Sequence, residues 1–432
     1  MSTPPPRLNT SSIAPGSPPH NTSTRTALYV INAVFLMWGL MTVLNDVLIP
    51  HLKGLFTLNY FQAMLVQFTF FGAYFIMSVP CGAVLARVGY RATIILGLLV
   101  TAMGALLFLP AAMLASYPLF LAAFFIMATG ITGLQVAANP YVSLLGDPRL
   151  ASSRLNLAQM FNSLGTVIGP FVIGPLILSG TALGAIALAQ LPAAQQLAYR
   201  LEQARLVQGP YLALALVLVL LSVAIWLFRL PPLAASEEDT VTNEHRFIDA
   251  LRHPHVALGV LAIFLYVGAE VTIGSFMINY ISLPQIGHID QATATRYVSL
   301  YWGGAMVGRF FGWLLMKRLN PRTILGVFAI LAGALVIITM LTTGDVALWS
   351  VVAIGLFNSV MFPTIFTLGI ERMGALTGRA SSLMIMGIVG GALLPPAQGY
   401  LADHIGVQPS FVLPLICYVY ICFYGFRGSR LA

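Results

Sequence analysis

The sequence is poor in charged residues. Only 8% of its 432 residues are charged, against about 25% in a typical soluble domain. Hydrophobic residues make up 58% of the chain, so too little polar surface remains to face water. These proportions exclude a soluble enzyme, a nucleic-acid-binding domain and a disordered chain. Apolar residues extend from one end to the other, which also excludes a single-pass receptor and leaves a polytopic membrane protein.

Cysteine is scarce as well. Cys81, Cys417 and Cys422 all lie in apolar runs without metal-ligating neighbours, so they predict neither a disulfide framework nor a metal site. The sequence also lacks a Walker A motif, G-x-S-x-G and H-E-x-x-H. We therefore expect no enzyme activity, no metal and no cofactor. Without a nucleotide site, transport energy would have to come from an ion gradient or a substrate gradient.

Long apolar runs, in contrast, are abundant. A membrane-spanning helix needs about 20 mostly apolar residues, and backbone polar groups in lipid must be satisfied internally, which favours helices over strands. Twelve runs have this character, at residues 27–50, 62–86, 94–115, 118–146, 153–180, 210–229, 255–282, 295–317, 323–342, 346–370, 379–402 and 408–427. The predicted fold is an all-α polytopic membrane protein, with twelve transmembrane helices in two six-helix pseudo-repeated halves.

Polar stretches divide the chain. Residues 1–26 are rich in Pro, Ser and Thr and are predicted to form a disordered cytoplasmic tail. Residues 230–253 hold five of the thirteen acids and are predicted to be a cytoplasmic linker. This linker separates an N-terminal half, 27–229, from a C-terminal half with a short cytoplasmic tail, 254–432. A long loop at 181–209 is expected to include a short surface helix.

Lysine and arginine are distributed unevenly over the two sides that these helices imply. With both termini on one side, sixteen of these residues fall on that side and four on the other. Such an excess marks the cytoplasmic side of a membrane protein. The net charge of +8 is therefore interpreted as a record of topology in a bacterial inner membrane with both termini cytoplasmic. It is not interpreted as a nucleic-acid signal.

Three groups of residues recur in the same order in both halves. In the first group, a glycine and a short apolar step precede two cations around a tight turn. The matched groups are Gly82, Arg87 and Arg91 with Gly312, Lys317 and Arg322; Arg154, Gly165 and Pro170 with Arg379, Gly390 and Pro395; and Asn139-Pro140 with Phe362-Pro363. Glycine and proline are common in membrane helices, but a shared order predicts duplicated halves with a substrate site between them near the midplane. The four cations of the first group are predicted gating-loop residues.

Asp46 is the first candidate for chemistry, because an ionisable group inside lipid is costly and functional by default. Trp38, Thr42 and Asn45 share one helical stripe with it. The ring can stack on the C–H face of a sugar, the polar groups can bind its hydroxyls, and a desolvated carboxylate can take up a proton. The alternative is a carboxylate near the helix end that simply reaches water.

Neutral amides line the fourth and fifth predicted helices. Gln135 and Asn139 are spaced i,i+4, while Asn156, Gln159 and Asn162 share a broad face with Ser163 and Thr166. Amides both donate and accept hydrogen bonds, which suits a polyol better than an organic anion. We predict Gln135, Asn139, Gln159 and Asn162 as substrate-binding residues. The alternative is that these amides hold helices together.

The C-terminal half has two ionisable residues inside predicted helices, Glu270 and Arg309. Glu270 points about 200° away from Thr272 at 100° per residue, so a cation-coupling role and a structural role toward neighbouring helices both stay open. Asn279 shares the stripe of Thr272 and is a predicted substrate-binding residue. Arg309 is expected to snorkel or to pair with an acid in a structural role.

Four segments resemble the sugar-permease branch of the major facilitator superfamily, which contains L-fucose permease and the bacterial glucose/galactose permeases. The segments are LNDVLIPHLKGLF (44–56), GITGLQVAANPYVSLLG (130–146), RLNLAQMFNSLGT (154–166) and FLYVGAEVTIGSF (264–276). The resemblance spans both halves and implies hexose uptake by proton or sodium symport, with no cofactor besides the coupling ion.

The resemblance also implies residue roles. The first-helix acid that is tied to coupling in the family matches Asp46, and the family's sugar-contacting amides match Gln159 and Asn162. Fucose permease has an acid where this sequence has Gln135, which is similar to the glucose/galactose branch and weakens a transfer of fucose specificity. Ala86 stands where an acid is usual in the superfamily's loop motif, which puts that gating salt bridge in doubt.

The sequence is therefore interpreted as a monomeric symporter for a neutral hexose, glucose or galactose first, whose partners are a sugar and the lipid bilayer. Two alternatives stay open. A drug or metabolite exporter of the same fold should have a mainly apolar, aromatic cavity with few amides. A non-transporting sugar sensor should carry a large signalling extension.

Overall fold

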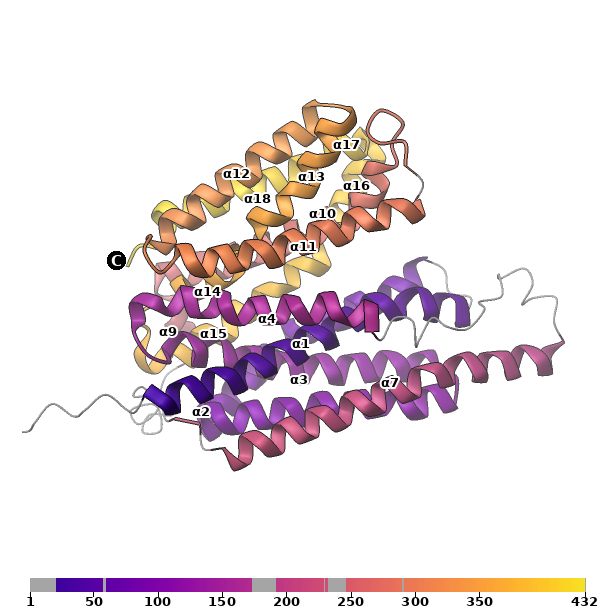
Figure 1. The fold of residues 1–432 in the computed structure, drawn as a ribbon, viewed down its shortest axis with the longest axis horizontal. Coiled ribbons are helices and arrows are strands. Elements are labelled where there is room, and N and C mark those ends of the chain that lie inside the picture. The colour runs from indigo at the N-terminus through magenta and orange to yellow at the C-terminus, as the bar shows by residue number, and fades with distance from the viewer. Residues whose placement is uncertain are drawn as a thin grey trace, which may run out of the picture.

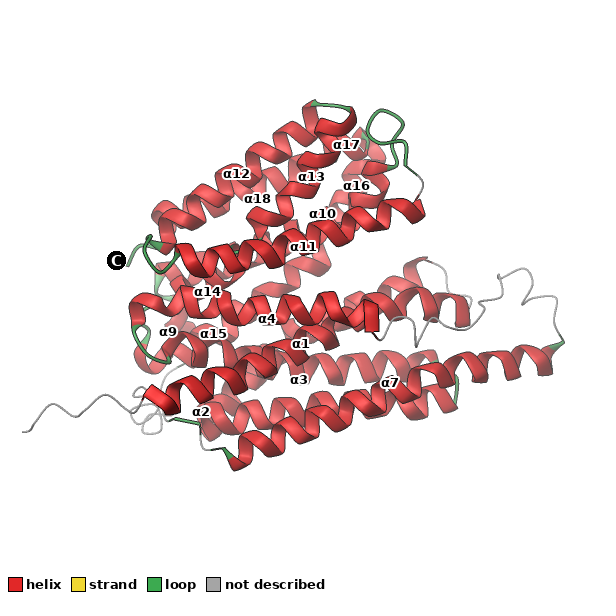
Figure 2. Ribbon diagram, in the orientation of Figure 1, coloured by secondary structure: helices red, strands yellow, loops and turns green. Residues whose placement is uncertain are grey.

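The computed structural model describes residues 21–56, 60–172, 192–228, 230–231, 246–289 and 291–431. All regular secondary structure in these ranges is helical, as the red ribbons of Figure 2 show. The helices run roughly along one common direction in two groups, indigo to magenta for the first part of the chain and orange to yellow for the second (Figure 1). The predicted all-α fold is confirmed.

The N-terminal half includes one helix that is far too long for a single crossing. Its elements are α1 (Asn21–Phe56), α2 (Tyr60–Met113), α3 (Tyr117–Leu144), η1 (Pro148–Leu150), α4 (Ala151–Val172) and α7 (Ala193–Leu227). At 1.5 Å per residue a straight α2 would be about 80 Å long, whereas the hydrocarbon core of a bilayer is about 30 Å thick. Gly89 interrupts α2 with φ 77° and ψ 174°, a backbone conformation that glycine adopts at little cost. It therefore separates the second crossing from the third, between the predicted helices 62–86 and 94–115.

The C-terminal half contains crossings that are built from more than one helix. Its elements are α9 (Phe247–Leu251), α10 (Pro254–Ile281), α11 (Gln291–Leu315), α12 (Pro321–Leu341), α13 (Gly344–Asn358), α14 (Met361–Gly369), η2 (Gly374–Leu376), α15 (Thr377–Met386), η3 (Gly387–Val389), α16 (Gly390–Ile405), α17 (Val407–Ser410), α18 (Val412–Phe423) and η4 (Tyr424–Gly428). The tenth crossing consists of α13 and α14. The eleventh consists of α15, η3 and α16, and the twelfth of α17, α18 and η4.

The described part of the chain contains nine stretches that are long and apolar enough to cross a membrane. One of them, Leu65–Met113, holds the two crossings of α2. Two further helices of spanning length, α4 and α11, carry buried polar residues such as Asn156 and Arg309 and are less apolar than the rest. Together these helices make up the twelve predicted crossings, six before and six after the linker.

Some boundaries differ from the predicted ones. The helix α1 begins at Asn21, so the last six residues of the predicted tail 1–26 are helical, because a helix can continue past the membrane edge on its own backbone hydrogen bonds. In the same way α7 begins at Ala193 and continues into the sixth crossing, where a separate surface helix was expected. The linker 230–253 contains α9. Residues 1–20, 173–191, 229 and 232–245 lie outside the described part.

The helices α1 and α4 approach each other closely within the N-terminal half. A Cβ on Gly39 would lie 1.9 Å from the carbonyl oxygen of Asn162, and one on Gly165 would lie 2.2 Å from that of Leu36. Only residues without a side chain fit at such distances. Small residues at helix contacts are a general feature of membrane bundles, and here they set the position of the amide-bearing α4 against α1.

The start of α1, α9 and the C-terminal end of the chain all lie at the left of Figure 1. We call this the basic end, because η1, α9 and the last described residues contribute Arg149, Arg252 and Arg430 there. α17 lies at the right of the same view, and we call that side the opposite end. The predicted arrangement, with both termini on one side of the bundle, agrees with this placement.

Candidate functional site

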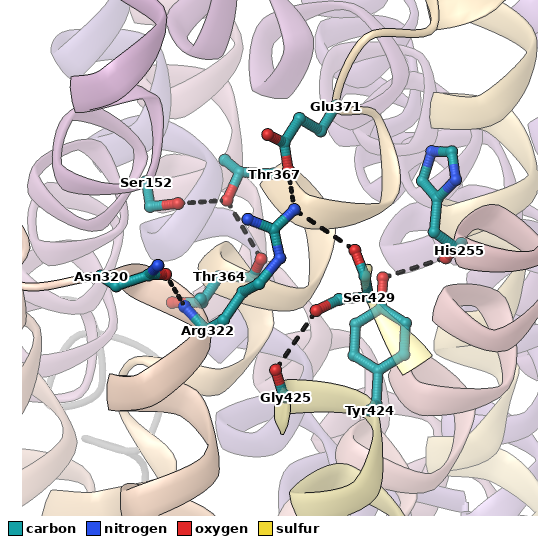
Figure 3. Close-up of polar contacts among 10 residues, drawn as sticks. All are labelled: Ser152, His255, Asn320, Arg322, Thr364, Thr367, Glu371, Tyr424, Gly425 and Ser429. Atoms are coloured by element: carbon teal, nitrogen blue, oxygen red, sulfur yellow. Dashed lines mark hydrogen bonds and ion pairs between the residues drawn. The ribbon is translucent and has the colours of Figure 1, made fainter. Parts of the chain in front are cut away.

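The two halves are joined by hydrogen bonds near the basic end. The hydroxyl groups of Ser152 and Thr367 lie 2.6 Å apart, and this contact links the first turn of α4 to the last turn of α14 (Figure 3). Ser381 in α15 donates across the interface to the carbonyl oxygen of Val136 in α3, at 2.8 Å. The helices that carry the predicted binding residues, α3 and α4, are therefore also helices that contact the other half.

The two amides of α3 are buried and incompletely bonded. Gln135 is 2% exposed and donates from Nε2 to the hydroxyl of Tyr74 at 2.8 Å, while its Oε1 has no hydrogen-bond partner. Asn139 is fully buried, and neither atom of its amide has a partner. Buried polar atoms are nearly always bonded in folded proteins. These open positions are what a bound water or ligand hydroxyl would satisfy.

The polar side chains of α4 divide into two groups. Gln159 is 3% exposed and its Nε2 has no partner, so it resembles the open amides of α3. Asn162 donates to the backbone oxygen of Phe35 in α1 at 3.2 Å. Asn156 donates to Ser152 O at 2.8 Å and to the sulfur of Met316 in α11 at 3.3 Å. Asn162 and Asn156 thus contact α1 and α11, while Asn156 Oδ1 and Gln159 Nε2 have no partner.

Trp38 connects the stripe of α1 to the amides of α3. Its side chain is 7% exposed, its ring centroid lies 5.2 Å from that of Phe35, and it hydrogen-bonds the hydroxyl of Tyr74. Thr42 donates to the Trp38 backbone oxygen at 3.0 Å, so its hydroxyl keeps its acceptor capacity. Through Tyr74, the structure brings Trp38 and Gln135 together.

The predicted coupling acid lies on α1, together with its neighbour Asn45. The backbone of α1 passes through both Asn45 and Asp46. Their side chains lie outside the part of the chain that the structure describes. The coupling role of Asp46 and the binding role of Asn45 stay predictions that rest on the sequence.

Glu270 faces neighbouring helices of its own half. Its Oε1 accepts a hydrogen bond from the hydroxyl of Tyr266, one turn earlier in α10, at 2.6 Å. Tyr301 in α11 donates to the backbone oxygen of Glu270 at 3.3 Å. Asn358 donates to the Tyr301 hydroxyl at 2.7 Å and accepts from that of Tyr418 at 2.6 Å. The acid therefore belongs to a network of polar groups that bond to one another across α10, α11, α13 and α18.

Arg309 does not reach the surface. The residue is 9% exposed, and its Nε donates to the backbone oxygen of Ser359 at 3.2 Å. Its Nη1 donates to the hydroxyl of Ser163 in α4, in the other half. The expectation that Arg309 snorkels is wrong, because Arg309 is buried on the side of α11 that faces α4. Glu270 interacts with it electrostatically without a close ion pair between them.

The predicted binding residue Asn279 lies on the exposed surface of α10, while Thr272 of the same stripe is fully buried with its hydroxyl unpartnered. The two residues of this stripe thus differ in burial. A buried amide that sequence reasoning missed, Gln398 in α16, also has no partner for either amide atom. Asn279 is not brought together with the amides of α3 and α4 by any contact in the described residues.

The predicted gating cations of the N-terminal half bond within that half. Arg91 donates from Nε to the Ile225 backbone oxygen at 3.3 Å and from Nη2 to that of Trp226, at the C-terminal end of α7. A cation there is stabilised by the helix dipole. Arg87 is exposed. In the conformation described, neither residue contributes a described bridge to the other half.

The cations of the C-terminal half behave similarly. Lys317 lies 3.7 Å from the ring centroid of Trp313 in its own helix. Arg322 forms an ion pair with Glu371 and donates to the Ser429 backbone oxygen at 3.3 Å, as Figure 3 shows. It therefore fastens the start of α12 to the segment after α14 and to the last residues of the chain. A gating role for these cations stays a prediction.

Several residues of these networks were missed by sequence reasoning. Tyr74, Tyr301 and Tyr418 are grouped with the hydrophobic residues in the composition, so their hydroxyls were not considered as hydrogen-bond partners. Asn358 could have been selected from the sequence, because it is an amide within an apolar run, as Gln135 is. Among the described residues no group of three or more His, Cys, Asp or Glu is placed to hold a metal ion.

Residues 30–391 match the family described as the Major Facilitator Superfamily. This chain belongs to the major facilitator superfamily. The glucose/galactose transporter of Brucella abortus is 45% identical over 404 residues, which cover 94% of each chain. The L-fucose-proton symporter of Escherichia coli is 35% identical over 406 residues, covering 93% of this chain and 92% of the relative. The predicted assignment to this superfamily, as a transporter and not an enzyme, is confirmed.

Solved structures agree with this major facilitator assignment. Crystal structures of the Escherichia coli fucose:proton symporter, one of them in the outward conformation, are 33% identical to this chain with a TM-score of 0.87. The match covers 94% of this chain and all of the solved chain. The two-half architecture is thus that of the superfamily, with the buried amides and Arg309 near the surface where the halves meet.

Proposed function

We propose that this protein imports a neutral hexose, D-glucose or D-galactose first, by cation symport through alternating access. The observation that carries this proposal is the group of open amide atoms on α3 and α4: Gln135 Oε1, both amide atoms of Asn139, and Gln159 Nε2. A neutral polyol offers hydroxyls that donate and accept, which is the chemistry these atoms lack. The names of the Brucella and Escherichia relatives support a sugar substrate.

The surroundings of the amides favour a neutral sugar over an organic anion. The residues with open amide atoms, Gln135, Asn139 and Gln159, are all uncharged. Arg309 brings one positive charge close to Gln159 through Ser163, but Glu270 opposes that charge. Trp38 adds an apolar ring that can stack on a sugar's C–H face, and Tyr74 links this ring to Gln135. The residues proposed to bind the hexose are Trp38, Thr42, Asn45, Gln135, Asn139 and Gln159, with Asn162 holding α4 in place.

The proposed coupling ion is a proton, with Asp46 as its carrier. A carboxylate inside a bundle has a large desolvation cost in its charged form and gains from protonation. The relative of known solved structure is named a proton symporter, which supports H⁺ before Na⁺. Glu270 is the second proposed coupling acid. No cofactor besides the ion is part of this proposal.

We place the basic end in the cytoplasm of a bacterial inner membrane, so that both termini are cytoplasmic. The excess of Lys and Arg at this end supports the assignment. The described inter-half hydrogen bonds lie toward this end, at Ser152, Ser381 and their partners, which supports a conformation closed to the cytoplasm. The likeness to an outward-conformation structure points the same way. The protein is proposed to act as a monomer.

The test is uptake by proteoliposomes that contain the full chain. Labelled D-glucose and D-galactose are offered with an imposed pH gradient alone, a Na⁺ gradient alone, or neither, and with L-fucose, N-acetylglucosamine and unlabelled hexoses as competitors. We expect accumulation under an inward proton gradient that an uncoupler abolishes. Accumulation under Na⁺ alone would overturn the proton assignment. Outward pumping of the compounds would indicate an exporter, and sugar binding without flux would indicate a sensor.

A further inference from the structure

Arg309 makes contacts to both halves of the protein from a buried position. Its Nε donates to Ser359 O in its own half, and its Nη1 donates to Ser163 Oγ in the other. A buried guanidinium is costly unless its donors are satisfied. The residue is 9% exposed, so these two contacts and the electrostatic interaction with Glu270 account for its stability inside the bundle.

The partner within the C-terminal half is a carbonyl at the junction of α13 and α14. α13 ends at Asn358 and α14 begins at Met361, so the Ser359 carbonyl lies at the junction. The backbone of Ser359 is helical, with φ −49° and ψ −46°. Its carbonyl has no donor from its own helix, because the residue four positions later is Pro363, which has no N–H. The guanidinium of Arg309 occupies that position, and it moves with this half as a rigid part of it.

The partner in the N-terminal half belongs to the amide face of α4. The hydroxyl of Ser163 donates to the backbone oxygen of Gln159 at 3.1 Å. The lone pairs of its oxygen are therefore free to accept the hydrogen bond from Arg309, so Ser163 donates one bond and accepts the other. The contact joins the proposed sugar-binding helix to the C-terminal half. Unlike Ser359, Ser163 must move relative to Arg309 when the halves rotate against each other.

Glu270 is the charged group that remains with Arg309 in either arrangement. Both residues are in the C-terminal half, and they interact electrostatically while the carboxylate accepts from Tyr266. Tyr301 on α11 and Tyr418 on α18 are the other titratable groups that face this site. When Ser163 moves away, the guanidinium loses a partner, and a charged Glu270 becomes its compensating group. A neutral Glu270 cannot compensate in this way.

We propose that Arg309 is a positioning residue that latches the two halves through Ser163, and that the charge of Glu270 controls how easily this latch opens. The latch stabilises the state that is closed at the basic end, and a charged Glu270 stabilises the released guanidinium of the open state. Protonation of Glu270 therefore favours the latched state. This inference rests on the proposed alternating-access function, and it assigns Arg309 to conformational change and not to sugar binding.

The test measures opening at the basic end without sugar. Ser381 is fully buried and bonds across the halves, so a Ser381→Cys change places a thiol that a maleimide reaches when this interface opens. The labelling rate is measured on the full chain in proteoliposomes, and the rate for the chain without Ser381→Cys is subtracted as background. Ser163→Ala and Arg309→Gln are each expected to raise the labelling rate by about 10-fold, because a hydrogen bond to a charged group is lost.

Three further variants identify the mechanism. Arg309→Lys should return labelling toward the original rate, because an ammonium can still reach Ser163. Adding Glu270→Gln to Ser163→Ala should lower labelling again, because the released guanidinium has lost its compensating charge. Ser350→Ala removes a buried hydroxyl that pairs with Thr339 within the C-terminal half, and it should leave labelling unchanged.

Unchanged labelling in both Ser163→Ala and Arg309→Gln would overturn the latch. If Arg309→Gln is not recovered in folded form, Ser163→Ala and Arg309→Lys decide the question alone. A rise in labelling when Glu270→Gln is added would show that the carboxylate holds the latch closed, contrary to the inference. The labelling assay contains no sugar, so a wild-type protein that transports no hexose would overturn the proposed function and leave this test readable.

Discussion

The two halves share a layout of six crossings but differ in how their buried polar groups are satisfied. In the N-terminal half, Gln135, Asn139 and Gln159 keep atoms without partners. In the C-terminal half, Tyr301, Asn358 and Tyr418 bond to one another, while Thr272 and Gln398 elsewhere in that half keep atoms without partners. A group that is already bonded must lose that bond before it can bind a hydroxyl, whereas an open amide gains one. The comparison favours sugar recognition by the open amides of α3 and α4 over the bonded network, with Gln398 in α16 as the open amide of the C-terminal half.

The halves remain alike at the basic end. Arg91 donates to the backbone oxygens of Ile225 and Trp226, and Arg322 donates to that of Ser429. In each case a cation near the start of the half's third crossing holds the end of its last crossing. The repeat found in the sequence therefore persists in the scaffold, while the interior residues have diverged.

The largest expected effect is at the proposed coupling acid of the N-terminal half. Asp46→Asn keeps the shape of the side chain and removes its charge, so accumulation driven by a gradient should be lost while sugar exchange survives. Uptake and counterflow by the same proteoliposomes measure this difference. Asp345→Asn, in the exposed first turn of α13, is the matched control and should accumulate sugar normally. Full accumulation of sugar by Asp46→Asn would show that Asp46 does not carry the coupling ion.

A smaller effect is expected from the amides of α4. Gln159→Ala removes a side chain with an open donor, and loss of a hydrogen bond to substrate typically costs about 1–3 kcal/mol. Its apparent sugar affinity should fall by roughly 10-fold or more. Asn162→Ala should lower affinity less, because its amide already bonds Phe35 O. Equilibrium binding of labelled hexose distinguishes them, and equal losses of affinity would place Asn162 in the sugar site as well.

Asn358→Ala examines the bonded network of the C-terminal half. The change leaves the Tyr418 hydroxyl without its acceptor and removes the donor to the Tyr301 hydroxyl, so the free energy of unfolding should fall by about 1–3 kcal/mol with little change in sugar affinity. Thermal unfolding in detergent and the binding assay measure the two quantities. A large loss of affinity at normal stability would contradict the comparison, since it would place a sugar contact in the network.

The smallest effect is expected at the cations of the basic end. The side chains of Arg322 and Glu371 are 26% and 33% exposed, and partly exposed ion pairs contribute about 1 kcal/mol or less. Arg322→Ala and Arg91→Ala should each lower thermal stability slightly and by similar amounts. Transport at saturating sugar should stay close to normal in both. A strong loss of transport in only one of them would indicate a gating role limited to that half.

Much of the fold was predictable because hydropathy and charge are properties of local sequence. Apolar runs of the length of a bilayer predicted the crossings, and the polar linker predicted the division into halves. Helix ends were less predictable, as at Asn21 and Ala193, because a helix can continue beyond the apolar run. The junction between Asn358 and Met361 was not predicted either, although its cause is in the sequence, because Pro363 has no N–H to bond the Ser359 carbonyl four residues earlier.

The candidate site divides in the same way. Local sequence is enough to show that Gln135, Asn139 and Gln159 are amides in membrane helices, where a polar side chain needs a partner. Which of them have a partner depends on the packed bundle, in which Asn162 contacts α1 and Arg309 bridges the two halves. The physical reason is that a hydrogen bond depends on which helices pack side by side, and at what rotation. Because these helices are far apart in the chain, their contacts form only when the whole bundle assembles.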